Sequence, residues 1–139
     1  MNKFILLLVL LFSINNLSAQ ESKSGIKFFE GSLEQAKSKA LTESKPIFIF
    51  CRTVWDYGSK KMLSDVLTNG EVGAFFNEKY INLKIDMEKG EGPSVAIKYD
   101  VTAYPSMIFI NSSGKKIGST YGVQTVERLI KKGEEALKK

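Results

Sequence analysis

The segment that most constrains the fold is Ile47-Phe48-Ile49-Phe50-Cys51, a continuous apolar run rich in β-branched and aromatic residues. Such a run, without polar alternation, predicts a strand that is buried on both faces. A strand of this kind belongs at the centre of a sheet with helices packed on its two sides. The sequence therefore predicts an α/β layer structure built around this strand.

The remaining elements are expected on both sides of this run. Ser32 and Gln35 have capping-box spacing before the apolar positions of a first helix, which is expected to end near Ser44. The other expected elements are a first strand at 26–29, a helix from Asp56 to about Thr68, a short helix at 72–76, a strand at 80–86, a short helix at 94–99, a hairpin of strands 106–110 and 116–121, and a last helix at 126–137.

This order, βαβα(α)βαββα, predicts a central mixed sheet flanked by helices, with a parallel centre and an antiparallel edge. Residues 1–19 have the pattern of a secretory signal: Lys3, the apolar stretch Phe4 to Phe12, and a small-residue cleavage context that ends at Ala19. An uncleaved membrane anchor is the alternative, but the apolar stretch is short for a membrane-spanning helix. We therefore expect one exported domain, residues 20–139, without stable membrane insertion after cleavage.

The charge and the reactive residue types exclude several functions. The chain has 20 lysines and arginines against 15 acidic residues, no histidine and one cysteine. The basic residues are dispersed, which favours solubility and does not indicate nucleic-acid binding. One cysteine cannot form an internal disulfide, and the absence of histidine removes the commonest metal ligand and the usual near-neutral general base. No metal and no cofactor are expected.

Three segments, in this order and at these separations, resemble the thioredoxin-like family, in particular its exported thiol:disulfide interchange proteins. The resemblance covers nearly all of residues 20–139 and implies the thioredoxin-like fold. The segments are Lys45 to Met62, which contains Trp55 and the four-residue slot Asp56-Tyr57-Gly58-Ser59; Ile85 to Gly92; and Tyr99 to Ser106, which contains Tyr104-Pro105.

The departures from the family pattern concern its chemistry. Asp56 and Ser59 stand where the family has its two redox cysteines, and Phe50 stands where many members have a buried carboxylate. Dithiol exchange needs a thiolate nucleophile and a second thiol that resolves the mixed disulfide. The sequence therefore predicts a redox-inactive protein that binds an exported protein or peptide.

The resemblance also implies where such a partner binds. In thioredoxin-like proteins the proline at the position of Pro105 is cis, and the preceding residue pairs with an extended peptide. The expected binding residues are Trp55, Asp56, Tyr57, Tyr104 and Pro105. Each of two residues also has a simpler alternative role that involves no partner. Asp56 could serve solely as a helix N-cap, and Pro105 could serve solely to shape its loop.

Two other classes of function remain as alternatives. Cys51 could serve as a single redox thiol, although its place in an apolar run favours a core residue. Ser59 has no histidine to activate it, so catalysis by its hydroxyl is not expected. The third class is a structural protein of the cell envelope. Export implies the periplasm if the source is Gram-negative and full secretion otherwise; the oligomeric state is not indicated.

Overall fold

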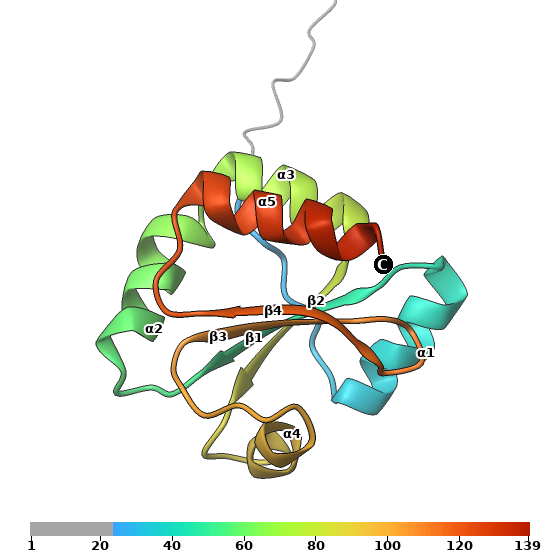
Figure 1. The fold of residues 1–139 in the computed structure, drawn as a ribbon, viewed down its shortest axis with the longest axis horizontal. Helices are drawn as coiled ribbons and strands as arrows, with labels where there is room; N and C mark the ends of the chain where they lie inside the picture. The colour runs from blue at the N-terminus through green and yellow to red at the C-terminus, as the bar shows by residue number, and fades with distance from the viewer. Residues whose placement is uncertain (1–23) are drawn as a thin grey trace, which may run out of the picture.

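The computed structural model describes residues 24–139, so the expected signal segment at 1–19 and its cleavage point lie outside the described residues. The chain folds into a four-stranded sheet with helices on both faces (Figure 1). The elements are α1 (Leu33–Glu43), β1 (Ile47–Arg52), α2 (Tyr57–Lys61), a π-helical turn (Met62–Val66), α3 (Gly70–Lys79), β2 (Ile81–Asp86), α4 (Gly92–Lys98), β3 (Ser106–Ile110), β4 (Lys116–Tyr121) and α5 (Val126–Leu137).

The sheet is mixed, with strand order β2-β1-β3-β4. β1 is parallel to β2, with Ile47 opposite Ile81, and antiparallel to β3, with Cys51 opposite Ser106. β3 and β4 form the antiparallel hairpin. The central position of the 47–51 strand and the mixed sheet are confirmed. The prediction of a parallel centre is wrong on one side of β1, because the short α4 to β3 connection brings β3 back in the opposite direction.

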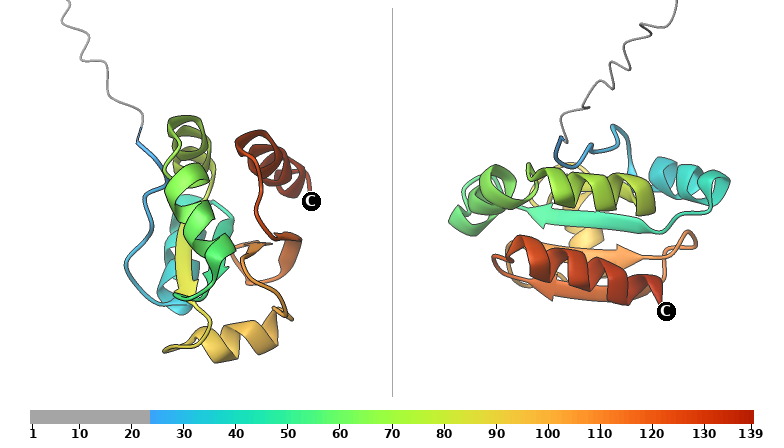
Figure 2. Two further views of the ribbon diagram at one scale, coloured as in Figure 1. Left: turned by 90° about the vertical axis from the view of Figure 1, so that its left-hand side faces the viewer. Right: turned by 90° about the horizontal axis from the view of Figure 1, so that it is seen from above.

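Each face of the sheet has its own hydrophobic cluster. Alternate residues of β1 divide between the clusters: Ile47, Ile49 and Cys51 point to one face, and Phe48 and Phe50 to the other. Figures 1 and 2 show α1 and α4 on the first face and α2, α3 and α5 on the second. Every residue from 47 to 51 is fully buried, which is why the strand is apolar without interruption.

The expected first strand at 26–29 is not a strand. Its backbone N–H groups bond to three different parts of the molecule: Ile26 to the Leu67 carbonyl, Lys27 to the Asn77 side chain, and Phe29 to the Asn82 carbonyl. One bond to β2 does not make a ladder. The apolar residues of the segment nonetheless pack against the two core clusters, which explains their strand-like alternation.

The helix expected from Asp56 to Thr68 is present, but its second half has π-helical hydrogen bonding. Asn69 then accepts hydrogen bonds from the backbone of Glu71 and Val72 and begins α3, which continues to Lys79. π-helical turns are rare and frequently lie next to functional sites. Here the turn joins the candidate site at the start of α2 to the core.

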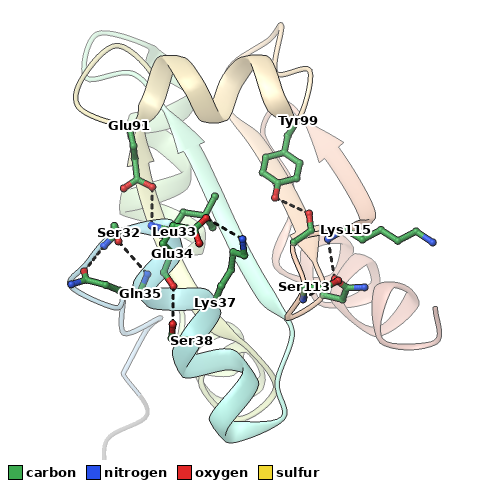
Figure 3. Close-up of polar contacts among 12 residues, drawn as sticks. Ser32, Leu33, Glu34, Gln35, Lys37, Ser38, Glu91, Tyr99, Ser113 and Lys115 are labelled. Atoms are coloured by element: carbon green, nitrogen blue, oxygen red, sulfur yellow. Dashed lines mark hydrogen bonds and ion pairs between the residues drawn. The ribbon is translucent and has the colours of Figure 1, made fainter.

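Polar contacts fasten α1 and α4 on the first face (Figure 3). Ser32 and Gln35 form the expected capping box at the start of α1, and Glu91 accepts a hydrogen bond of 2.8 Å from the Leu33 backbone. The Tyr99 hydroxyl donates to the Gly114 carbonyl in the β3–β4 turn at 2.8 Å. These bonds connect α4 with two segments that are distant in sequence, and so fix the approach to Pro105.

Candidate functional site

Asp56 lies at the start of α2 and acts as its N-cap. Its backbone is extended, and its Oδ2 accepts a hydrogen bond of 2.7 Å from the Ser59 N–H. This bond satisfies one of the amide groups that have no partner within a helix. The side chain is half-buried and occupied by the capping bond, so the capping role is present in the structure.

Ser59 occupies the second of the two positions at which the thioredoxin-like pattern has a cysteine, and it lies inside the protein. The residue is completely buried, and its Oγ has no hydrogen-bond partner among residues 24–139. A nucleophilic hydroxyl needs both access to a substrate and a base within hydrogen-bond reach. The surroundings of Ser59 provide neither.

Trp55 and Tyr104 lie together on the surface although they come from different loops. Their ring centroids are 6.4 Å apart and the rings are perpendicular, an edge-to-face arrangement. The indole N–H donates a hydrogen bond to the Glu88 carboxylate, so a third loop also holds the indole. Trp55 is 63% exposed and neighbouring Tyr57 is 76% exposed, whereas Tyr104 is half-buried.

The loop that contains Pro105 packs directly against the start of α2. The Tyr104–Pro105 peptide bond is cis, and the Pro105 carbonyl accepts a hydrogen bond of 2.8 Å from Gly122 N–H. A Cβ on Gly58 would lie 2.9 Å from Pro105 Cδ and 3.4 Å from a methyl group of Val123. Glycine at position 58 therefore allows three loops to meet at this point.

The five residues expected to bind a partner are thus brought to one end of the sheet. Three further apolar side chains, which the sequence patterns did not single out, are exposed there: Val54, Tyr121 and Val123. Tyr121 is paired with Ser106, the residue after Pro105, so the expected hairpin register contained the signal that could have found it. We call the exposed or half-buried group Val54, Trp55, Tyr57, Tyr104, Tyr121 and Val123 the Trp55–Tyr104 surface.

Gln124 and Met62 position the β4 side of this surface. The Gln124 backbone N–H contacts Met62 Sδ at 3.2 Å, and its side-chain amide donates to the Tyr121 carbonyl at 2.9 Å. Met62 is the first residue of the π-helical turn and is fully buried. The segment after β4 is therefore attached to the helix whose start carries Trp55 and Tyr57.

Cys51 lies in the core and not at the surface. It is fully buried in the cluster that α1 and α4 cover, and burial raises the pKa of its thiol to about 12. Phe50, at the position where many family members have a carboxylate, is also fully buried, on the opposite face of the sheet. Neither a thiolate nor a buried proton acceptor is placed where dithiol chemistry needs one.

Residues 24–139 contain no cluster of three or more histidine, cysteine, aspartate or glutamate residues arranged to hold a metal ion. None of the helices between Leu33 and Leu137 has the length and apolar character of a membrane span.

Comparison with known proteins identifies the class to which this fold and site belong. A family described as thioredoxin-like matches residues 29–112, more than half of the chain. The solution structure of a proposed disulphide isomerase from Bacteroides thetaiotaomicron is 38% identical over 82% of this chain and 94% of that chain, with a TM-score of 0.73. The chain belongs to the thioredoxin-like family, as its sequence predicts. No curated protein matched.

Two more distant structures support the fold alone. A DsbH oxidoreductase is 21% identical over 88% of this chain and 93% of that chain, with a TM-score of 0.74. The oxidised C-terminal domain of DsbD from Neisseria meningitidis is 19% identical over 80% of this chain and 98% of that chain, with a TM-score of 0.64. The likeness thus includes proteins whose names refer to thiol chemistry, while this chain has a single cysteine.

Proposed function

We propose that this protein is an exported, redox-inactive member of the thioredoxin-like family that binds a protein or peptide through the Trp55–Tyr104 surface. The observation that carries the proposal is the combination at one end of the sheet. The positions of the redox cysteines hold a capping Asp56 and a buried Ser59, while exposed aromatic side chains surround the Pro105 loop. The site therefore has an exposed aromatic surface but no cysteine nucleophile.

The composition of this surface favours recognition of a polypeptide. Aromatic side chains contribute large contact areas at low entropic cost and are enriched at interfaces between proteins. Trp55, Tyr57 and Tyr121 are all more than half exposed, so a partner would bury substantial apolar area there. Tyr104 contributes the half-buried base of the same surface.

The redox reading has little support from the environment of the one thiol. A thiol whose pKa is raised to about 12 has almost no thiolate at neutral pH, and its side chain is not accessible to a protein substrate. An insulin-reduction assay with dithiothreitol tests this part. We expect turnover equal to the reagent background; turnover that disappears in Cys51→Ser would contradict the proposal.

Export rests on the signal-like segment at 1–19, with the periplasm as destination in a Gram-negative source and secretion otherwise. Mass spectrometry of the protein isolated from its native host tests this part. A mature N-terminus at Gln20 supports export, and an intact Met1 in a soluble internal fraction contradicts it.

Partner capture tests the binding function itself. The chain from Gln20 is immobilised and exposed to the exported proteins of the native host, and the captured proteins are compared between variants. Trp55→Ala/Tyr104→Ala and the independent pair Tyr57→Ala/Tyr121→Ala should each lose the partner that the wild type retains. Ile97→Ala, which removes an exposed apolar side chain of α4 that lies outside the Trp55–Tyr104 surface, is the matched control.

Circular dichroism establishes that each variant is folded, which matters most for half-buried Tyr104. Retention of the partner by both folded double variants would place the interface elsewhere and overturn the assignment.

A further inference from the structure

The end of the molecule opposite the Trp55–Tyr104 surface has a different character. Four segments meet there: the end of α1, the start of β1, the β3–β4 turn and the end of α5, which Figure 1 shows at the side marked C. They border a hollow of about 410 Å³ that is open to solvent. Its lining includes Leu41, Lys45, Leu137 and Lys139.

Lysines surround this hollow. Lys45 and Lys139 line it, and a neighbouring hollow of about 510 Å³ shares Lys139 and adds Lys115 and Lys116. Among the described residues that line the two hollows, none has an acidic side chain. The nearest acid on α1, Glu43, is shared between Lys39 at 2.6 Å and Lys45 at 3.9 Å.

Three of these lysines keep their charge free for a partner. Lys115, Lys116 and Lys139 form no ion pair within the part of the chain that the structure describes. The Lys116 ammonium donates to the neutral carbonyl of Tyr99 at 3.2 Å, which leaves two of its N–H groups available. Figure 3 shows the Lys115 side chain extending away from the turn.

Two leucines lie exposed among these lysines. Leu41, in the last turn of α1, is 71% exposed, and Leu137, at the end of α5, is 40% exposed. Both border the larger hollow. We call Leu41, Lys45, Lys115, Lys116, Leu137 and Lys139 the basic end.

We infer that the basic end docks the protein peripherally on an anionic lipid bilayer. Lysine ammonium groups complement headgroup phosphates, and the leucines enter the boundary between headgroups and acyl chains. An acidic protein would satisfy the lysines but gives no reason for leucines exposed between them. Docking in this orientation leaves the Trp55–Tyr104 surface, at the other end of the sheet, facing solution.

Vesicle flotation tests this inference. The protein used is the chain from Gln20, because both core clusters lie within residues 24–139 and the apolar stretch at 4–12 would itself bind lipid. We expect association with phosphatidylcholine vesicles that contain phosphatidylglycerol, and much weaker association with phosphatidylcholine alone. Binding should fall as salt is raised, because exposed charges are screened within about 10 Å at 0.1 M salt.

Substitutions separate the contributions of charge and apolar contact. Lys115→Gln/Lys116→Gln should lower the partition coefficient by about 25-fold, since each lysine near an anionic surface contributes about fivefold. The control variant Lys60→Gln/Lys89→Gln removes the same charge from exposed positions outside the basic end, so the partition coefficient should change little. Leu41→Ala/Leu137→Ala should also weaken binding, whereas Tyr57→Ala should not.

Several results would overturn the inference. Equal binding to neutral and anionic vesicles would remove the role of the lysines, and an unchanged partition coefficient in Lys115→Gln/Lys116→Gln would place the contact elsewhere. Loss of vesicle binding in Tyr57→Ala would show that the Trp55–Tyr104 surface, and not the basic end, contacts the membrane. Binding to polyglutamate with no binding to anionic vesicles would assign the basic end to an acidic protein.

Discussion

Cys51 should be nearly inert in the native protein, and the structure gives the size of the effect. A thiol whose pKa is about 12 is thiolate to about one part in ten thousand at pH 8, whereas an ordinary thiol with a pKa of about 8.5 is thiolate to about one quarter. Only the thiolate reacts with iodoacetamide. Native Cys51 should therefore react more than about a thousandfold more slowly than Cys51 in the unfolded chain.

The assay is mass spectrometry of the protein after timed exposure to iodoacetamide, with and without denaturant. Cys51→Ser/Ser94→Cys moves the only thiol to an exposed position on α4 and is the matched control, which should label quickly without denaturant. Rapid labelling of native wild-type Cys51, with a midpoint near pH 8, would show instead that Cys51 is an accessible thiol with an ordinary pKa. It would also restore the single-cysteine redox alternative.

Three further predictions concern stability. The pKa of Cys51 is raised in the folded state, so the stabilisation from the protonated thiol is complete below the pKa of the unfolded thiol and is lost as pH rises toward about 12. Between about pH 9 and about pH 11, the free energy of unfolding in urea should therefore fall by about 2 kcal/mol more for the wild type than for Cys51→Ala. Asp56→Ala should lower the free energy of unfolding, measured in urea, by about 1 kcal/mol, whereas Asp56→Asn, which keeps the accepting oxygen, should lower it by only a few tenths of a kcal/mol. Equal losses in the two variants would contradict the capping role. Tyr80→Phe removes the hydrogen bond from the buried Tyr80 hydroxyl to the Gly133 carbonyl and should lower the free energy of unfolding by about 0.5–1.5 kcal/mol. Tyr121→Phe, at an exposed tyrosine, should leave the melting temperature unchanged.

Elements whose signals are local could be predicted from the sequence. The 47–51 run gave the central strand, the Ser32 and Gln35 spacing gave the start of α1, and Asn111 to Gly114 gave the hairpin turn. The capping role of Asp56 belongs to the same group because an N-cap bonds within three residues of its own chain. Burial of Cys51 followed from its place in the apolar run.

Features that depend on contacts between distant segments could not be predicted from local sequence signals. Residues 26–29 have strand-like alternation, but their hydrogen-bond partners, Leu67, Asn77 and Asn82, are distant in sequence. A Cβ at Gly25 would lie too close to the Leu67 carbonyl oxygen and to Thr68 Cα, so the absence of a side chain at position 25 lets the segment pass close to this backbone. The direction of β3 was missed because a short helix does not reveal which way the chain returns.

The candidate surface was only partly predicted for the same reason. Trp55 and Tyr104 came from the family resemblance, but Val123 joins them because Gly58 leaves room beside Pro105 and because Gly122 adopts a positive φ of 78°. Tyr121 reads locally as the last residue of an edge strand. Its exposure beside the Pro105 loop follows from the hairpin register and from the hydrogen bonds of Gln124.

The emission of Trp55 reports directly on peptide binding at the proposed surface, because Trp55 is the only tryptophan of the chain and lies within that surface. A tryptophan-free peptide from a captured partner is added to the protein while Trp55 fluorescence is recorded, and calorimetry measures binding independently. We expect a saturable blue shift with the same affinity as the calorimetric binding, because a bound peptide removes water from the exposed indole. Calorimetric binding with no change in Trp55 emission would contradict this expectation.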